Sequence, residues 1–416
     1  MMAWRTHVWR QLTRPRQRVG RRVTRMGRGS RGGVALLTTI ALVALMGVIV
    51  TEITFMATMR LQLAANQRDE AKAEALAQAG VQFYRLILIA SKQLGQSPMI
   101  QSLGPMLGVN ADTLWQLVPE VGSGFLRFLL MADGDKEEAS ELARAGIDAA
   151  LNDGEEIPQT TLKKHFLDFD GDFQASVQPE DQRIFVGSFQ ATTLGDLQLE
   201  PKAGLLIGLM SGDAQSDFLR ERDLEMWELI GNLSDWTDPD DTRIFRGGSE
   251  NALYERLEPP YLSKNGAFDS REEIRLVDGW NSDQVWYRFG QHLTIYGSGK
   301  VNVNAADRRV LEALLFRYIQ PQPRNVDIIL DLIMQFRRTP PELGGGLFRG
   351  ADSFVGFIQQ YAPGTIDPAI NQVITTESEI FRITSKGDVR NANVSIEAVL
   401  DFSKSPMGKV VYWNVR

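Results

Sequence analysis

The feature that most constrains this chain is a run of 18 uncharged, mostly apolar residues, Val34 to Thr51, placed directly after a basic leader. Residues 1–33 contain ten arginines and no acidic residue. An apolar run of this length is typical of a helix that spans a bilayer. Because positive charge is retained in the cytoplasm, we expect a single-pass inner-membrane protein with a cytoplasmic amino terminus and a periplasmic body.

The helix is predicted to continue well beyond the apolar run. Residues 60–95 are rich in Ala, Leu, Glu, Lys and Gln and contain no helix breaker until about Gly95. Some 60 helical residues would extend roughly 90 Å. One apolar stripe at spacings of three and four is predicted to pack on a globular domain or on neighbours; it comprises Ala73, Leu76, Gly80, Phe83, Ile87 and Ala90.

Two other interpretations of this amino-terminal segment compete with a retained spanning helix. A cleaved secretory signal also has a basic region followed by an apolar one. The unbroken helical pattern after the apolar run argues against cleavage there. The leader by itself is also consistent with an uncleaved signal anchor, which stays as an alternative.

Composition excludes several classes of protein. The chain has 416 residues, enough for two or three domains, and no cysteine, which excludes disulfides, Cys-ligated zinc, iron–sulfur clusters and thiol nucleophiles. Only three histidines occur, so a Ser/His/Asp hydrolase has few parts to work with, and we expect no enzyme. Residues 34–416 carry all 52 acidic groups and 35 of the 45 basic ones, which disfavours nucleic acid as a partner.

The fold is predicted to be α+β, with a small antiparallel sheet split by a large helical insertion. The predicted boundaries are a leader at 1–33, a long helix at 34–95, a helical insertion at 96–170, a first part of the sheet at 171–208, an inserted helical domain at 209–372, and closing strands with a tail at 373–416. Turns are expected at Pro179-Glu-Asp, at Leu194-Gly-Asp and at Lys386-Gly-Asp. Asn304 is expected to cap the helix that begins at Ala305.

A cluster of carboxylates is the main candidate site. Asp235, Asp238, Asp240 and Asp241 fall within seven residues, and Glu250 follows beyond two glycines. Hard oxygen ligands on a turn suit Ca²⁺, which accepts six to eight oxygens in flexible geometry. A solvated acidic loop without metal is the alternative.

The leader junction, RGSRGGVALLTTIALVALMGVIV, resembles the prepilin-type leader of type IV pilins and type II secretion pseudopilins. The resemblance implies that prepilin peptidase cuts between Gly33 and Val34, with Gly32 as the fallback, and that the new amino terminus is methylated. Most of that superfamily has Glu at the fifth mature position, where this chain has Thr38. The same departure is typical of minor pseudopilin K.

Three further segments resemble the pseudopilin K family: LIGNLSDWTDPDD with the residues that follow it, VNVNAADRRVLEALL, and FRITSKGDVRNANVSIEAVL. The resemblance implies a pseudopilin fold and calcium in the helical domain. It also implies a function in initiating and capping the periplasmic pseudopilus of a type II secretion system. The implied partners are pseudopilins I and J, the major pseudopilin, prepilin peptidase and the inner-membrane assembly platform. A minor pilin of a type IV pilus and an anchored periplasmic metalloenzyme are the alternatives.

Overall fold

The computed structural model describes residues 31–95, 115, 120–124, 170–321, 325–340, 344–362 and 365–416. Nearly all of the predicted leader and most of the predicted 96–170 insertion lie outside these residues. The chain forms two compact units, residues 1–65 and residues 66–416, and each is described by itself.

The described part of the first unit is the amino-terminal stretch of α1, a helix that runs from Arg31 to Gly95. Every side chain from Gly33 to Ala64 is exposed, and the apolar ones include Val34, Leu42 and Leu61, which are 62%, 58% and 70% exposed. By length and composition, this is the one helix among the described residues that could cross a membrane. An exposed apolar surface of this extent is typical of a segment that contacts lipid or another protein.

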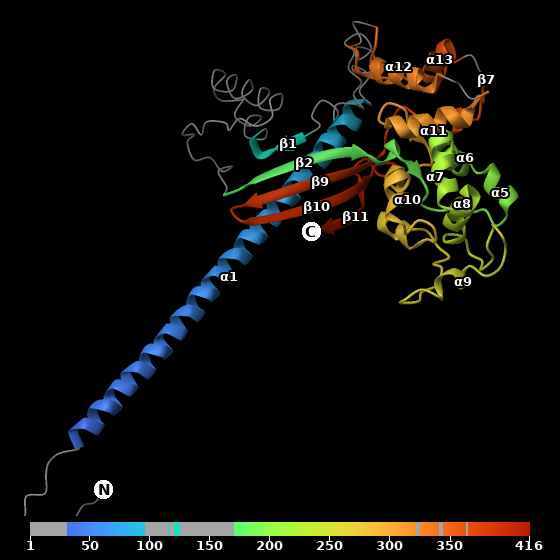
Figure 1. Cartoon of the computed structure of the whole chain (residues 1–416). Coiled ribbons are helices and arrows are strands. Elements are labelled where there is room, and N and C mark those ends of the chain that lie inside the picture. Colours follow the sequence, from blue (N-terminus) through green and yellow to red (C-terminus); the bar gives the residue numbers. More distant parts are fainter. Residues whose placement is uncertain are drawn as a thin grey trace, which may run out of the picture. The chain divides into compact units, whose positions relative to one another are not determined.

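A five-stranded antiparallel sheet is the framework of the second unit (Figure 1). Its spatial order is β1-β2-β9-β10-β11, so β2, early in the chain, pairs directly with β9, close to its end. The predicted split sheet is therefore confirmed. The strand bounds are Glu120–Gly122 for β1, Asp172–Pro179 for β2, Ile380–Val389 for β9, Ala392–Asp401 for β10 and Lys409–Val415 for β11.

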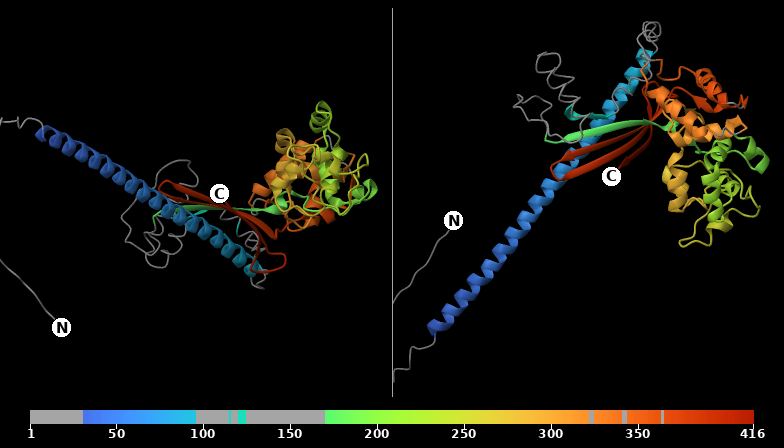
Figure 2. Two further views of the ribbon diagram at one scale, coloured as in Figure 1. Left: turned by 90° about the horizontal axis from the view of Figure 1, so that it is seen from below. Right: turned by 45° about the horizontal axis from the view of Figure 1, so that its top comes forward.

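The carboxyl-terminal stretch of α1 packs across one face of this sheet (Figure 2). Glycines permit the close approach, since a Cβ built on Gly387 of β9 would lie 2.0 Å from the carbonyl oxygen of Ala73. The buried helix face differs slightly from the predicted stripe, because Ala90 is exposed while Tyr84 and Leu88 are buried. The small residues on α1 let its backbone approach the strands, which carries these two larger side chains into the core.

The expected turn at Lys386-Gly-Asp is wrong. These residues lie inside β9, and the chain reverses at Arg390 and Asn391, where Arg390 has a φ of 54°. Gly387 is present because α1 crosses there, a requirement that a turn-like tripeptide does not reveal. The predicted tail also differs, since residues 409–415 form β11 at the edge of the sheet.

The helical domain inserted between β2 and β9 has its own hydrophobic core. That core begins at Ile184, so the sheet contribution predicted for 171–208 ends at Pro179, and no hairpin forms there. Leu194-Gly-Asp, expected as a turn, opens a helix that Thr193 caps by accepting a hydrogen bond from the Asp196 amide. The helices of the domain are α5 (Leu194–Leu199), α6 (Pro201–Met210), α7 (Asp213–Glu221), α8 (Met226–Asp235), α9 (Asn251–Tyr254), α10 (Asp283–Arg288), α11 (Arg308–Tyr318), α12 (Val326–Arg338), α13 (Ala351–Tyr361) and α14 (Ile370–Val373).

Shorter elements complete the domain. Three two-residue strand pairs close its loops, β3 with β4, β5 with β8, and β6 with β7. The strand bounds are Ile184–Phe185 for β3, Leu293–Thr294 for β4, Val301–Asn302 for β5, Ile319–Gln320 for β6, Thr365–Ile366 for β7 and Ile374–Thr375 for β8. The 3₁₀ turns are η2 (Glu180–Gln182), η3 (Arg271–Leu276) and η4 (Gly290–His292).

A buried ion network joins the sheet to the helical domain. Glu180, fully buried just after β2, accepts hydrogen bonds from the Arg382 guanidinium on β9 and from the Thr294 hydroxyl on β4. Arg382 also pairs with Glu397 on β10, and the Arg183 guanidinium lies 3.6 Å from the Glu180 carboxylate. Because each charge has a partner in a low-dielectric setting, the network fixes the exit of the sheet into the domain.

Replacing Arg382 by methionine is expected to lower the free energy of unfolding by about 3 kcal/mol, because the buried Glu180 loses its closest cationic partner and keeps only the more distant Arg183. The measurement is thermal or denaturant unfolding of the detergent-solubilised full chain. Lys386→Met is the matched control, since Lys386 is exposed on the same strand. Equal stability of the two variants would contradict this function of the network.

Candidate metal centre

The candidate site begins where α8 ends. Asp235 is the last residue of α8, and its carboxylate accepts a hydrogen bond of 3.0 Å from the Ile244 amide. The chain continues in a tight turn in which the Asp238 amide donates to the Ser234 carbonyl at 2.9 Å. This turn directs Asp238 toward the same interior space as Asp235.

A hairpin-like loop brings in the third carboxylate. Thr242 and Ser249 form an isolated antiparallel bridge, and the Arg243 amide donates to the Gly248 carbonyl at 2.9 Å. Gly247 and Gly248 both have positive φ, at 68° and 92°, which glycine adopts without strain. The loop therefore returns the chain to α8 and places Glu250 beside its end.

Asp235, Asp238 and Glu250 form one buried group. Each offers a carboxylate oxygen, and these three oxygens lie within 4.8 Å of one another. Their exposed fractions are 3%, 0% and 0%. One oxygen of each aspartate and both oxygens of Glu250 are buried and have no hydrogen-bond partner among the described residues. Buried, unpaired carboxylate oxygens that converge in this way require neutralisation by protons or by a cation.

The pKa values of all three groups are raised. Burial is the main cause in each case, and it raises the pKa of Asp235 to about 7, that of Asp238 to about 6 and that of Glu250 to about 8. Repulsion from the neighbouring carboxylates, including Asp240, adds to each rise. The isolated protein therefore holds protons at this site near neutral pH.

Asp240 and Asp241, the other two predicted ligands, lie outside the group. Asp240 is partly exposed and accepts a hydrogen bond from the Thr242 amide at 2.7 Å. Asp241 is exposed and binds the Ser249 hydroxyl at 3.0 Å and the Asn251 side-chain amide at 2.7 Å. Asp241 thus holds the loop that carries Glu250, a function that spacing in the sequence does not distinguish from metal ligation.

The group fits a hard divalent cation. It supplies only oxygen ligands, and Ca²⁺ would offset two of the three negative charges of the ionised group. The site is rooted in the domain core, because the neighbouring Trp236 is buried, makes an edge-to-face contact with Tyr254 and donates its indole N–H to Glu273 at 2.9 Å. A cation held here would stabilise the fold of the loop.

The other predicted site residues lie in α1. Gly33 lies in the first helical turn described, and a Cβ at this position would meet nothing within 4 Å. Val34 is exposed, and the Thr38 hydroxyl donates to the Ala35 carbonyl at 2.9 Å. This bond leaves Thr38 with a local partner on its own helix.

The expected cap at Asn304 is wrong. Asp307 caps α11 by accepting a 2.8 Å hydrogen bond from the Val310 amide. Asn304 instead bridges distant loops, since its side chain donates to the Phe348 carbonyl and accepts from the Phe348 amide, at 2.9 and 2.8 Å. Both residue types are good caps, and the tertiary contact with Phe348 decides between them.

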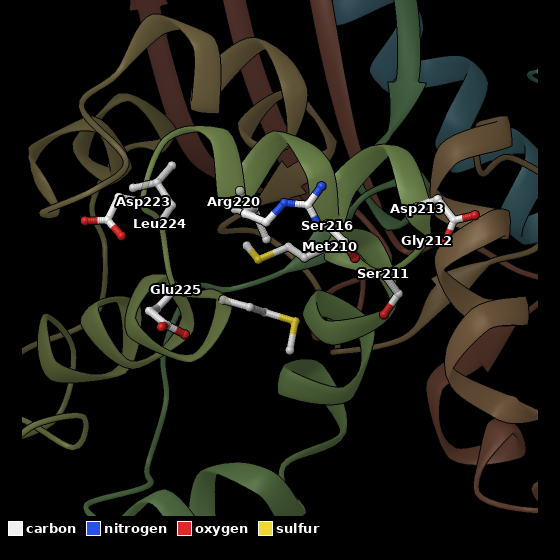
Figure 3. Close-up of a pocket in the computed structure, with 11 residues that line it drawn as sticks. Met210, Ser211, Gly212, Asp213, Ser216, Arg220, Asp223, Leu224 and Glu225 are labelled. Atoms are coloured by element: carbon white, nitrogen blue, oxygen red, sulfur yellow. The ribbon is translucent and has the colours of Figure 1, made fainter.

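A second concave feature lies between α6, α7 and the start of α8 (Figure 3). It is an open cavity of about 590 Å³, with Met210 and Met226 on its wall and Asp213, Asp223 and Glu225 among its lining residues. Sequence reasoning did not find it. Its carboxylates are exposed and do not converge as those of the metal centre do.

Comparison with known proteins supports the family expected from the sequence. Residues 219–297, which contain the three-carboxylate group, match the family model described as type II secretion system (T2SS), protein K. The type II secretion system protein K of Aeromonas hydrophila is 26% identical over 183 residues, which cover 44% of this chain and 52% of that protein. Both matches indicate a similarity to protein K of the type II secretion system over part of this chain.

The alignment thus spans about half the length of the curated protein K that the chain matches. A solved structure, the crystal structure of the GspK-GspI-GspJ complex from the enterotoxigenic Escherichia coli type 2 secretion system, is similar at a TM-score of 0.44 and 15% identity. That match covers 70% of this chain and 96% of the other. The family model and the curated relative are both named for the type II secretion system, and neither is named for a type IV pilus.

A rise in pH is expected to lower the stability of the folded chain, and calcium is expected to raise it. Without a cation, the three carboxyls ionise near pH 4 in the unfolded chain but between about pH 6 and 8 when folded. The folded state binds more protons in this window, so the free energy of unfolding falls as the pH rises through it. In chelator, the melting temperature of the full chain should drop between about pH 5 and pH 8, and excess Ca²⁺ should restore it, most strongly at the higher pH.

Glu250→Gln should remove most of this calcium response, since it takes away a charged ligand at the centre of the group. Glu255→Gln is the control, because Glu255 is exposed five residues further on. Calcium titrations followed by differential scanning calorimetry compare the two. A calcium response that persists in Glu250→Gln, or that is absent from the wild type, would contradict the metal centre.

Proposed function

We propose that this chain is a minor pseudopilin, of the K type, that initiates and caps the tip of the periplasmic pseudopilus of a type II secretion system. The observation that carries the proposal is the family match over residues 219–297 in a chain whose α1 leaves its apolar amino-terminal stretch uncovered. The proposed partners are pseudopilins I and J, the major pseudopilin, prepilin peptidase and the inner-membrane assembly platform. The function is one of assembly and requires no catalysis.

The proposed location is the inner membrane. Ten arginines precede the apolar stretch and none of the acidic residues does, which favours a cytoplasmic amino terminus and a periplasmic body. Prepilin peptidase is proposed to cut between Gly33 and Val34. The apolar stretch that follows the cut is then retained as the membrane anchor and as the contact with other subunits.

Two features support a position at the tip. Thr38 replaces the Glu that other members place at the fifth mature position, where a carboxylate is thought to neutralise the amino terminus of a neighbouring subunit. A subunit with no neighbour above it needs no such group. The bulky helical domain, inserted between β2 and β9, would also obstruct a further subunit above it.

The three-carboxylate group is proposed to bind a structural Ca²⁺. Asp235, Asp238 and Glu250 would hold the ion. The ion would supply the positive charge that the buried oxygens lack, and it would tie the loop containing residues 241–250 to the end of α8. The chain contains no disulfide, so a metal tie of this kind would add to its stability outside the cytoplasm.

Processing tests the first part of the proposal. In cells with prepilin peptidase, the wild-type chain is expected to begin at Val34, whereas Gly33→Leu should keep its leader, because a large side chain occupies the position before the cut. Amino-terminal sequencing of the membrane-extracted protein is the measurement, with a strain lacking the peptidase as a reference.

Gly47→Leu is the matched control for processing. Gly47 also lies within α1, and a Cβ at either glycine meets nothing within 4 Å, so both changes leave the helix environment alike. The control should be processed normally. A wild-type chain that begins well downstream, past Met59, and is free of lipid would overturn the proposal.

Placement tests the second part. Thr38→Glu puts a carboxylate into the apolar stretch without a partner above it, which costs up to about 2.5–3.5 kcal/mol at the bilayer centre. We expect less of the variant to co-purify with pseudopilins I and J and secretion to fall. Thr39→Gln, the neighbouring polar change, should have the smaller effect. Unchanged placement and secretion in Thr38→Glu would remove this argument for the tip.

A further inference from the structure

The outer edge of the sheet is a strand without a partner. β11 pairs with β10 on one side, and no described residue pairs with its other side. Figure 1 shows it as the last strand of the sheet. Natural sheets usually protect such edges with charges, proline or short strands, because a free edge readily pairs with another chain.

The sequence of β11 does not have this protection along its length. Its interior reads Val-Val-Tyr-Trp-Asn-Val, without a charge or a proline. Val411, Trp413 and Val415 are 39%, 38% and 43% exposed. β-Branched and aromatic residues of this kind favour strand pairing. An exposed strand with this composition is an aggregation hazard unless another strand covers it.

The register shows which backbone groups are free. Ser395 and Arg416 exchange two hydrogen bonds of 2.8 Å, so they form a hydrogen-bonded pair. In an antiparallel ladder, hydrogen-bonded pairs alternate with pairs that are not hydrogen-bonded. Val415 and Trp413 belong to the second kind, so their N–H and C=O groups point away from β10. The ladder to β10 uses the groups of Tyr412, Asn414 and Arg416, and no turn, loop or cap hydrogen bond of the described residues uses those of Trp413 and Val415. They form a short template for an added strand.

The side chains define the two faces of this template. Trp413 and Val415 lie opposite Ala398 and Ile396, whose side chains are buried on the face that α1 covers. On the other face, Tyr412 contacts Tyr296 of the helical domain, with ring centroids 6.1 Å apart. Trp413 and Val415 remain 38% and 43% exposed, so α1 covers this side of the edge only in part. A subunit that has its own helix on the same side of its sheet could continue both the sheet and the layer formed by α1.

Charge indicates which strand would pair here. The segment from Phe402 to Arg416 contains Lys404, Lys409 and Arg416 but no acidic residue. Arg416 lies 3.8 Å from carboxylates of Glu272 and Glu397, so Lys409 is the basic residue of the strand that a partner would face. If antiparallel, with the outward groups of Trp413 and Val415 paired, two copies of β11 offer no acidic residue to each other; if parallel, they bring Lys409 against Lys409. Such like-charge pairs are destabilising across strands. The occupant is thus a different chain whose strand has an acidic residue at the end opposite Lys409, which a second copy of β11 cannot supply.

We propose that β11 is a docking edge for an acidic-ended strand of another pseudopilin subunit, which extends the sheet by main-chain hydrogen bonds at Trp413 and Val415. This proposal rests on the proposed function, because it takes the partner from the same assembly. Main-chain pairing supplies affinity, and the apolar side chains of the edge supply specificity.

Proline at position 413 separates edge pairing from simple apolar contact. Trp413→Pro removes the outward N–H but leaves the inward bonds of residues 412 and 414 to β10. Trp413→Thr removes the ring but keeps the N–H and a β-favouring side chain. We expect Trp413→Pro to lower the amount of co-purified pseudopilin roughly tenfold, and Trp413→Thr to lower it much less. Equal losses in the two variants would overturn strand pairing.

A photo-crosslinker identifies the partner without relying on the proline variant. Benzoylphenylalanine is placed at position 413 of the full chain in membranes, and at Tyr287, which is 71% exposed on α10, as the control. The expected adduct forms only at position 413, and mass spectrometry places it in a strand of another pseudopilin with an acidic residue at one end. No adduct, or an adduct with a second copy of this chain or with a protein outside the assembly, overturns the proposal.

The cross-linking outcome is separable from the proposed function. Amino-terminal processing at Gly33 and export by the secretion system are measured in the same cells. Missing cross-links with processing and export intact would overturn the docking edge alone. Missing processing or export would overturn the proposed function as well.

Discussion

Pairing of β2 with β9 is the contact on which the rest of the second unit depends. Eight consecutive pairs, from Asp172 opposite Asp388 to Pro179 opposite Phe381, join two segments separated by the whole helical domain. This pairing creates the surface on which α1 lies, and it brings both ends of the inserted domain to one end of the sheet. The entropic cost of closing this loop grows only with the logarithm of its length, and the two hydrophobic cores and the buried ion network offset it.

The chain treats buried charge in two contrasting ways. Glu180 is buried beside Arg382 and Arg183, so its charge is neutralised within the protein. Asp235, Asp238 and Glu250 are equally buried but have no cationic side chain among them, and their unpaired oxygens converge. The first arrangement is complete by itself and joins two layers. The second has no internal counter-charge, and burial therefore raises the pKa of these carboxyls. Protons or a cation must supply the missing positive charge, which makes this group the candidate for metal binding.

Exposed apolar surface is distributed in a similarly uneven way. The amino-terminal stretch of α1 presents apolar side chains that no described residue covers, and β11 has an edge that no described strand pairs with and three partly exposed apolar residues. The helical domain, by contrast, encloses its large aromatic residues, including Trp280 and Phe354. A protein that assembles with others needs such open surfaces, and a membrane and neighbouring subunits would each cover a different one.

The sequence by itself determined the features that depend on neighbours along the chain. The apolar helix, the acidic segment around Asp238 and the strand character near Ile396 follow from local periodicity and charge. Only the tertiary structure decided that Gly387 serves helix packing rather than a turn, and that Asp307, not Asn304, caps α11. In the folded chain Glu250, and not Asp241, is the third member of the buried group. Glu180 likewise pairs with Arg382, which is 202 residues away in the sequence. The reason is physical: periodicity reports which face of an element is apolar, whereas the partner of a glycine, a cap or a buried charge is set by segments that meet only when the chain has folded.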